Sequence, residues 1–179
     1  MINKSARTTA APFPALATQL SLQEAGPRRE ILIVDDVPEI LDFFKGLSRR
    51  LNGLSVHVTT ENNSARALDA VKAQKFDVIV SDYRMRQVDG VEVLQAAREH
   101  HPAGHRILMT GYNEIPTSLD RIRAAGVDAY IQKPLKSHDL LLLLLDFLHG
   151  NEAAIAACRG HARELEAIAS REEQAFGLA

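Results

Sequence analysis

The sequence predicts an α/β domain with a doubly wound, five-stranded parallel sheet. From residue 30 onward, short apolar runs of strand length alternate five times with longer segments whose apolar residues recur at helical spacing. The runs expected to be strands are continuously apolar, which is typical of parallel strands that are buried on both faces. Because parallel strands need crossover connections, we expect helices on both faces of the sheet.

The first two strand–helix units begin at residue 31. An unbroken apolar run at 31–34 predicts the first strand, and Pro38 suits the first turn of a helix that extends to about Leu51. The second strand is expected over 55–59. Ser64 then starts the second helix, whose apolar residues recur every three or four positions.

The remaining three units repeat the pattern. Residues 78–81 form an apolar run that predicts the third strand, and Gly90 precedes a helix with apolar residues at helical spacing. The alternation continues with strands at 106–109 and 129–132 and with helices at 116–125 and 137–148.

The chain is expected to divide into three parts, at 1–28, 29–149 and 150–179. The first is rich in Ala, Thr, Ser and Pro and is interpreted as a flexible leader, and the second is the α/β domain. In the third, Gly150 indicates a helix stop and Asn151 can cap a further helix. That helix would carry a narrow apolar stripe of Ile155, Ala162, Leu165 and Ile168 or Ala169.

A lone helix of this kind is marginal in water, so we expect it to pack on the domain body, on a second copy or on a downstream domain. The alternative is that it continues the fifth helix and frays at Gly177. The segment is too short for a helix-turn-helix module with its own core, so direct DNA binding is not expected.

Composition and charge exclude several classes of function. The 21 basic and 23 acidic residues are mixed along the 179-residue chain, and a formal net charge of −2 does not attract nucleic acid or an anionic membrane. The longest strongly apolar run, 140–145, is far too short to cross a bilayer. Cys158 is the single cysteine, so no internal disulfide forms. We therefore expect a soluble, cytoplasmic protein with no membrane contact.

Polar side chains follow four of the five expected strands. Asp35 and Asp36 follow the first, Asp82 the third, Thr110 the fourth and Lys133 the fifth. In doubly wound sheets, ligands bind outside the carboxyl ends of the strands. Three carboxylates gathered there repel one another unless a cation lies between them, and oxygen ligands suit Mg²⁺. The joint placement predicts a site for metal and phosphate.

The same residues suit phosphoryl transfer. Asp82 is the best-placed nucleophile, because an ionised carboxylate attacks phosphorus when nearby cations offset the charge of the incoming oxygens. The hydroxyl of Thr110 and the ammonium of Lys133 would each hold one phosphoryl oxygen, and no separate general base is required.

The motifs ILIVDD, VIVSDYRM, LMTGY and YIQKP occur in this order over roughly residues 30–149. In this respect the chain resembles the receiver domains of bacterial two-component response regulators, in the CheY-like superfamily. The resemblance implies a flavodoxin-like sheet of strand order 2-1-3-4-5. It also implies site roles: metal binding for Asp35, Asp36, Asp82 and the backbone carbonyl of Arg84, phosphoacceptance for Asp82, phosphate contact for Lys133 before a usually cis Pro134, and a switch pair of Thr110 and Tyr130.

The resemblance further implies the partners and the output. A sensor histidine kinase or a phosphotransfer protein would supply the phosphoryl group, with Mg²⁺ or alternatively Mn²⁺ as cofactor. The face of the fourth helix, fifth strand and fifth helix would then change shape and bind an effector protein or a second copy. The chain would catalyse only its own phosphorylation and dephosphorylation. Alternatives are a phosphotransfer intermediate, a phosphate sink, a pseudo-receiver or a metabolite phosphatase, although neither Asp35 nor Asp82 has a second aspartate two residues later.

Two features depart from the family pattern. Met85-Arg86 stands where the family often has Met-Pro, which removes a rigid constraint and adds a cation. Arg84 and Tyr112 occupy the two variable positions that are thought to tune loss of the phosphoryl group, so turnover is expected to be individual to this chain.

Simpler interpretations exist for several of these residues. The acidic pair after the first strand could serve the start of a helix, and Tyr130 could be an ordinary strand aromatic. His100, His101 and His105 are interpreted as solvated imidazoles around a turn and not as a zinc site.

Overall fold

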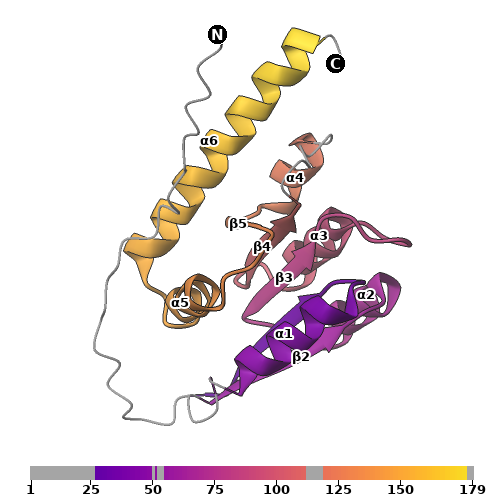
Figure 1. Ribbon diagram of the computed structural model, residues 1–179, viewed down its shortest axis with the longest axis vertical. Helices are drawn as coiled ribbons and strands as arrows, with labels where there is room; N and C mark the ends of the chain where they lie inside the picture. The colour runs from indigo at the N-terminus through magenta and orange to yellow at the C-terminus, as the bar shows by residue number, and fades with distance from the viewer. Residues whose placement is uncertain (1–26, 50, 52–54, 112–118, 177–179) are drawn as a thin grey trace, which may run out of the picture.

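The computed structural model describes residues 27–49, 51, 55–111 and 119–176, with the side chains of 168, 169 and 171–176 left out. Strands and helices alternate along the chain, and two helices follow the last strand (Figure 1). The elements are β1 (Arg29–Val34), α1 (Pro38–Ser48), β2 (Val56–Glu61), α2 (Ser64–Ala73), β3 (Val78–Asp82), α3 (Gly90–His100), β4 (His105–Thr110), α4 (Leu119–Ala125), β5 (Ala129–Gln132), α5 (Ser137–Leu148) and α6 (Glu152–Phe176).

The five strands form one parallel sheet in the order β2-β1-β3-β4-β5. This order confirms the predicted fold class. It reverses between β1 and β3, which are direct neighbours with Val34 paired to Ser81. Because all strands point the same way, the residues that follow β1, β3, β4 and β5 meet at one edge of the sheet.

The apolar strands bury both of their faces. One core lies between the sheet and helices α1 and α5, where Ile33, Phe44 and Leu143 are buried. The other lies between the sheet and helices α2, α3 and α4, where Leu32, Leu94 and Ile122 are buried. Residues next to each other in β1 therefore belong to different cores, which explains the unbroken apolar run.

Helix α6 is separate from α5, as the expected helix stop predicts. Gly150 ends α5 with a φ of 66°, and the side chain of Asn151 accepts a hydrogen bond from the backbone N–H of Ala154. The two helices are bent by 116°. The alternative of one continuous fifth helix is therefore wrong.

The remaining bounds differ little from the expected ones. β5 and α5 have the predicted limits, whereas α1 ends at Ser48 and leaves Leu51 as a buried residue beyond it. α2 begins at Ser64 as predicted, and its cap is Asn63, whose side chain accepts the N–H of Arg66. Residues 1–26 of the predicted leader, which was expected over 1–28, lie outside the described residues, and so does the start of the predicted fourth helix.

Candidate functional site

The acidic residues of β1 and β3 lie together at the carboxyl edge of the sheet. Single carboxylate oxygens of Asp35, Asp36 and Asp82 all lie within 4.8 Å of one another. Asp35 and Asp82 are buried, whereas the side chain of Asp36 is 23% exposed. The sequence predicted that these three residues lie together, and the geometry agrees with this prediction. Among the described residues, they form the one cluster of such groups that could hold a metal ion.

Lys133 enters this cluster from the end of β5. Its ammonium lies 2.7 Å from Asp35 Oδ2 and 2.6 Å from Asp82 Oδ1. Burial alone would lower the pKa of Lys133, but the hydrogen bonds to Asp35 and Asp82 outweigh burial and raise it. The site therefore keeps a permanent cation between two carboxylates.

Backbone hydrogen bonds orient both buried carboxylates. Asp35 Oδ1 accepts the N–H of Val37 at 2.9 Å, and Asp82 Oδ2 accepts the N–H of Arg84 at 3.1 Å. Asp35 thus also serves the turn before α1, so the simpler interpretation holds beside the metal interpretation. Because these bonds fix one oxygen of each group, the other faces Lys133.

The other expected residues surround the cluster. Thr110 ends β4, and its backbone carbonyl accepts the N–H of Lys133 at 2.9 Å. Lys133 precedes Pro134 in a cis linkage, as the resemblance implies. Arg86 lies at the open side, with Nε 3.7 Å from Asp36 Oδ2, and Tyr112 lies outside the described residues.

Tyr130 of β5 has a partner that the sequence did not indicate. Its ring packs against the core on the α2–α4 side, and its hydroxyl donates a 3.1 Å hydrogen bond to Glu166 Oε1 of α6. Burial, with the nearby Glu166 carboxylate, raises the pKa of Tyr130 well above its ordinary value. The hydroxyl therefore remains a proton donor at all physiological pH values.

Gly90 is a second residue that sequence reasoning missed. Its N–H donates to the carbonyl of Tyr83, and a Cβ at this position would lie 1.9 Å from the carbonyl oxygen of Asp82. The start of α3 therefore touches the backbone that carries the acidic cluster. A glycine at a helix start is the available signal, but it does not reveal such a close approach.

The histidines do not form a metal site, but two of them are not solvated as expected. The Nε2 atom of His101 lies 2.6 Å from the carbonyl of Val71, and the His105 ring packs against Phe147 at 4.8 Å. Nδ1 is buried in both His101 and His105. The packed α3–β4 connection, which the sequence presents as a polar turn, accounts for this difference.

Fold and site together define a receiver-type signalling domain. The family model of the response regulator receiver domain matches residues 31–145, and the chain belongs to this family. Receiver domains bind Mg²⁺ at an acidic pocket and are phosphorylated on aspartate, and family members are generally not metabolic enzymes. This chain contributes such an acidic cluster.

Individual proteins agree with this assignment. The transcriptional regulatory protein ZraR of Klebsiella oxytoca is 31% identical over 124 residues, which are 69% of this chain and 27% of that protein. FixJ of Bradyrhizobium diazoefficiens is 25% identical over 80% of this chain and 70% of its own length. A CheY-like receiver from Methanospirillum hungatei aligns with a TM-score of 0.62 and 30% identity over 70% of this chain and 97% of that one.

The chain spans about a quarter of the length of the first curated relatives that it matches. Several relatives are named transcriptional regulators, so the comparison does not support the expected absence of DNA binding, which stays a prediction. Among the described residues no single helix is long and apolar enough to span a membrane; only α5 paired with residues 152–167, at their sharp bend, meets the length and composition test.

Proposed function

We propose that this chain accepts a phosphoryl group on Asp82 from a phosphohistidine of a sensor histidine kinase or a phosphotransfer protein. The strongest support is the position of Lys133, whose ammonium lies 2.6 Å from Asp82 and 2.7 Å from Asp35. A cation held beside a nucleophilic carboxylate offsets the charge of the incoming phosphoryl oxygens.

In the proposed reaction, a carboxylate oxygen of Asp82 forms the new bond to phosphorus while the bond from phosphorus to the donor nitrogen breaks. The bonding electrons leave with the imidazole of the donor, which takes up a proton, so this chain needs no general base. Lys133 would contact one phosphoryl oxygen, and the hydroxyl of Thr110 would donate to another.

The donor set of the acidic cluster fits Mg²⁺, with Mn²⁺ as the alternative. Asp35, Asp36, Asp82 and the backbone carbonyl of Arg84 would supply hard oxygen ligands, and the three carboxylates already lie within reach of one ion. When bound, the ion neutralises charge on the phosphoryl oxygens. The partly exposed Asp36 leaves an entry from solvent.

The output is proposed to pass from Thr110 to Tyr130. An acyl phosphate would attract the Thr110 hydroxyl and leave room for Tyr130 to turn inward, which changes the face of α4, β5 and α5. That face would bind an effector protein or a second copy in the cytoplasm. Arg84 and Tyr112 would tune how quickly water removes the phosphoryl group.

Mass spectrometry of the intact chain tests the acceptor. After incubation with acetyl phosphate and Mg²⁺, we expect the added mass of one phosphoryl group, and no addition in Asp82→Asn or after chelation of the metal. Asp42→Asn, which removes an exposed carboxylate of α1 that is not part of the cluster, should be labelled like the parent chain. Labelling that persists in Asp82→Asn would reject this acceptor, and repeated hydrolysis of a phosphorylated metabolite would favour a phosphatase.

A further inference from the structure

Helix α6 covers the face from which the proposed output would emerge. In Figure 1 it runs beside β5, between α5 and α4. It contacts β5, α5 and α4. The chain therefore carries its own occupant for the α4–β5–α5 face.

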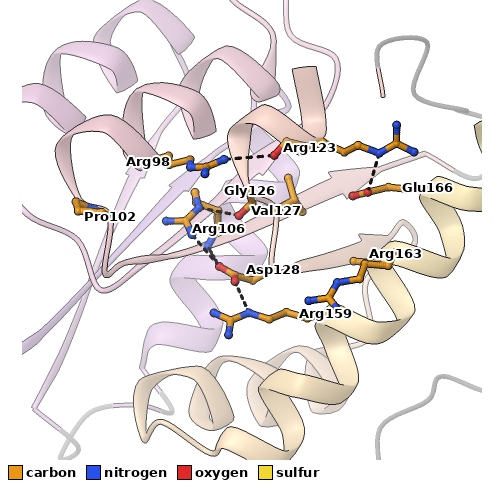
Figure 2. Close-up of a pocket in the computed structure, with 11 residues that line it drawn as sticks. Arg98, Pro102, Arg106, Arg123, Gly126, Val127, Asp128, Arg159, Arg163 and Glu166 are labelled. Atoms are coloured by element: carbon orange, nitrogen blue, oxygen red, sulfur yellow. Dashed lines mark hydrogen bonds and ion pairs between the residues drawn. The ribbon is translucent and has the colours of Figure 1, made fainter. Parts of the chain in front are cut away.

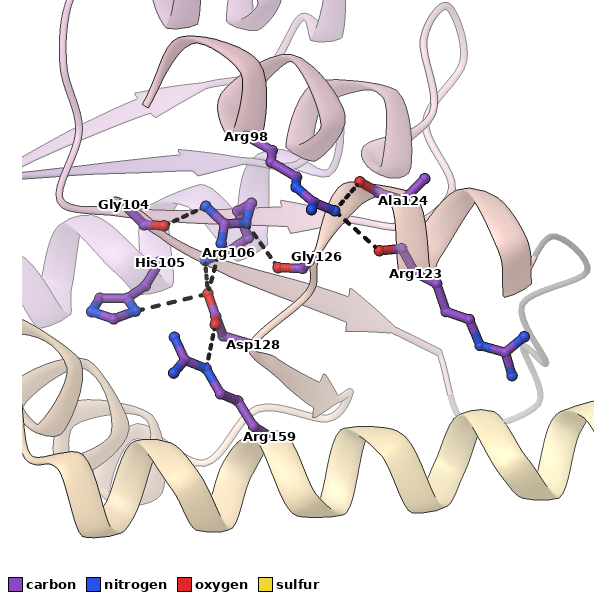
Figure 3. A network of polar contacts seen from close by, with 9 residues as sticks. All are labelled: Arg98, Gly104, His105, Arg106, Arg123, Ala124, Gly126, Asp128 and Arg159. Carbon is purple, nitrogen blue, oxygen red and sulfur yellow. Dashed lines mark hydrogen bonds and ion pairs between the residues drawn. The ribbon is translucent and has the colours of Figure 1, made fainter. Parts of the chain in front are cut away.

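The first turns of α6 are held by apolar packing and one ion pair. Ile155 and Ala162 are buried, and Cys158 packs against the core under α5. Arg159 Nε donates at 2.7 Å to Oδ1 of Asp128, the residue just before β5 (Figure 3). These contacts do not involve any residue of the proposed site.

The next turn is held through Tyr130. The side chain of Glu166 is only 12% exposed; its Oε1 accepts the Tyr130 hydroxyl, and its Oε2 lies 3.5 Å from Arg123 Nε of α4 (Figure 2). Arg123 also donates to the hydroxyl of Ser170 at 2.9 Å. One acidic side chain of α6 thus connects the proposed switch residue with α4.

Beneath these contacts, α6 is not closely packed. A cavity of about 540 Å³ lies between α6 and the domain body, and Figure 2 shows it lined by charged side chains of both. Five arginines line it: Arg98, Arg106, Arg123, Arg159 and Arg163. The part of α6 that rests on this polar cavity gains little from apolar burial, so hydrogen bonds and ion pairs carry most of the docking of this part of the helix.

We propose that α6 is an output element of this chain, docked by the Tyr130–Glu166 hydrogen bond while Asp82 is unmodified and released when Asp82 is phosphorylated. This inference rests on the proposed function. A hydroxyl that turns inward with its ring cannot reach Glu166, so the carboxylate would lose its neutral donor and retain only Arg123. Gly150, whose positive φ ends α5, is the hinge about which the helix would move.

Coupling of this kind is reciprocal. If phosphorylation weakens the docking of α6, then docked α6 must weaken binding of a phosphoryl analogue at Asp82 by the same factor. A net hydrogen bond to a charged group corresponds to roughly tenfold in an equilibrium constant. Both directions can be measured on the full chain.

Cys158 reports the docking of α6 without any added label. It is the single cysteine, it is half-buried, and burial raises its pKa to about 11. We expect its reaction with a maleimide at neutral pH to accelerate roughly tenfold when the phosphoryl analogue beryllofluoride and Mg²⁺ saturate the site. Release of α6 would return the thiol to an ordinary pKa, which raises the fraction of thiolate. The lower pKa also makes each thiolate less nucleophilic, and this offsets part of the gain. Asp82→Asn should show no acceleration.

Two conservative variants test the Tyr130–Glu166 hydrogen bond, here called the latch, separately from other effects. Tyr130→Phe keeps the ring but removes the hydroxyl that donates to Glu166. Glu166→Gln leaves only a neutral, weaker acceptor for that hydroxyl and removes the charge that pairs with Arg123. Each variant should raise the maleimide rate severalfold without beryllofluoride. Glu166→Gln should also bind beryllofluoride severalfold more tightly. Glu164→Gln is the matched control, because that carboxylate is on the same helix but highly exposed, and it should change neither quantity.

The outcomes distinguish the two proposals. If beryllofluoride binds and acetyl phosphate adds its mass, yet the Cys158 rate stays constant, the latch is rejected and the acceptor role of Asp82 stands. If neither reagent modifies or binds the chain, the proposed function fails and the latch fails with it. Equal maleimide rates for the parent chain, Tyr130→Phe and Glu166→Gln would also reject the latch.

Discussion

Asp128 connects the amino-terminal ends of β4 and β5 with helix α6. It is buried, accepts the N–H of Arg106, and lies within ion-pair distance of Arg106 and Arg159 (Figure 3). Burial alone would raise the pKa of its carboxyl, but His105 at 3.8 Å, the Arg106 N–H and Arg159 together lower it to about 2. The ionised form of this carboxyl is therefore favoured more strongly in the folded chain than in the unfolded chain.

This shift makes a prediction about pH. Because the folded pKa of about 2 is below the reference value of 3.8, the ionised carboxylate stabilises the fold fully above pH 4, and this contribution is lost as pH falls from 4 towards 2. The difference corresponds to about 2 kcal/mol in the free energy of unfolding. Asp128→Asn should lose at least this much at pH 7, measured by urea unfolding.

The difference in free energy of unfolding between Asp128→Asn and the parent chain should then become smaller below pH 4. Asp120→Asn is a suitable control, because its side chain is fully exposed beside Arg123 and should change stability little at any pH. A gap that is the same at pH 7 and pH 3 would contradict the assigned role of the Asp128 charge.

Residues of the candidate site could be predicted where topology alone brings them together. Asp35, Asp82 and Lys133 each follow a strand, and parallel strands deliver such residues to one edge whatever the details of packing. Glu166 and Gly90 could not be predicted, because their contacts depend on how one particular helix approaches the sheet. The half-buried side chains of His101 and His105 were not predicted for the same reason.

At the scale of elements, the junction of β3 and α3 decides how accurately Asp82 is placed. Alanine at position 90 would put its Cβ 1.9 Å from the Asp82 carbonyl oxygen and 2.8 Å from its carbonyl carbon. Since neither backbone atom can yield as a flexible side chain does, the helix or the strand end must shift.

Gly90→Ala should therefore lower the free energy of unfolding by about 1–3 kcal/mol and slow phosphorylation of Asp82. Thermal unfolding and the rate of phosphoryl labelling check the two effects. Gly46→Ala in α1 is the comparison: its Cβ would meet nothing within 4 Å, so helix propensity should stabilise the chain by up to about 1 kcal/mol. Labelling of Gly90→Ala at the parental rate would show that the close approach does not position Asp82.

The elements themselves were predictable to different degrees. Between β5 and α5 the sequence changes sharply from a short apolar run to apolar residues at helical spacing. The limits of both elements were therefore predicted correctly. The stop signal at Gly150 and the cap at Asn151 predicted that α6 is a helix, but they did not predict where it packs. Its narrow stripe is compatible with several surfaces, so only tertiary structure selects β5 and α5.

At the scale of the whole molecule, the two cores share one sheet. Leu94 belongs to the core under α2, α3 and α4, and Leu143 to the core under α1 and α5, yet both pack against the same central strands. Loss of either core would expose the strand face that it covers and remove support from the strands on which the other core packs, so we expect residues 29–148 to unfold in a single transition.

Leu94→Ala and Leu143→Ala should each cost about 2–5 kcal/mol and lower one common transition. Circular dichroism and tyrosine fluorescence during urea unfolding should give coincident curves in both variants. Leu165→Ala, which shortens a partly exposed side chain of α6, should cost much less. Two separated transitions would instead mean that the faces unfold independently.

The position of α6 also matters for β5 as an edge strand. β5 ends the sheet, so one side of its backbone has no strand neighbour within the sheet, and α6 runs along this margin. Bare strand margins are templates for pairing with other polypeptides, and natural proteins cover them with helices. Undocking of α6 would thus expose backbone N–H and C=O groups of β5 as well as a surface of side chains. The docked helix therefore also protects this edge from pairing with strands of other chains.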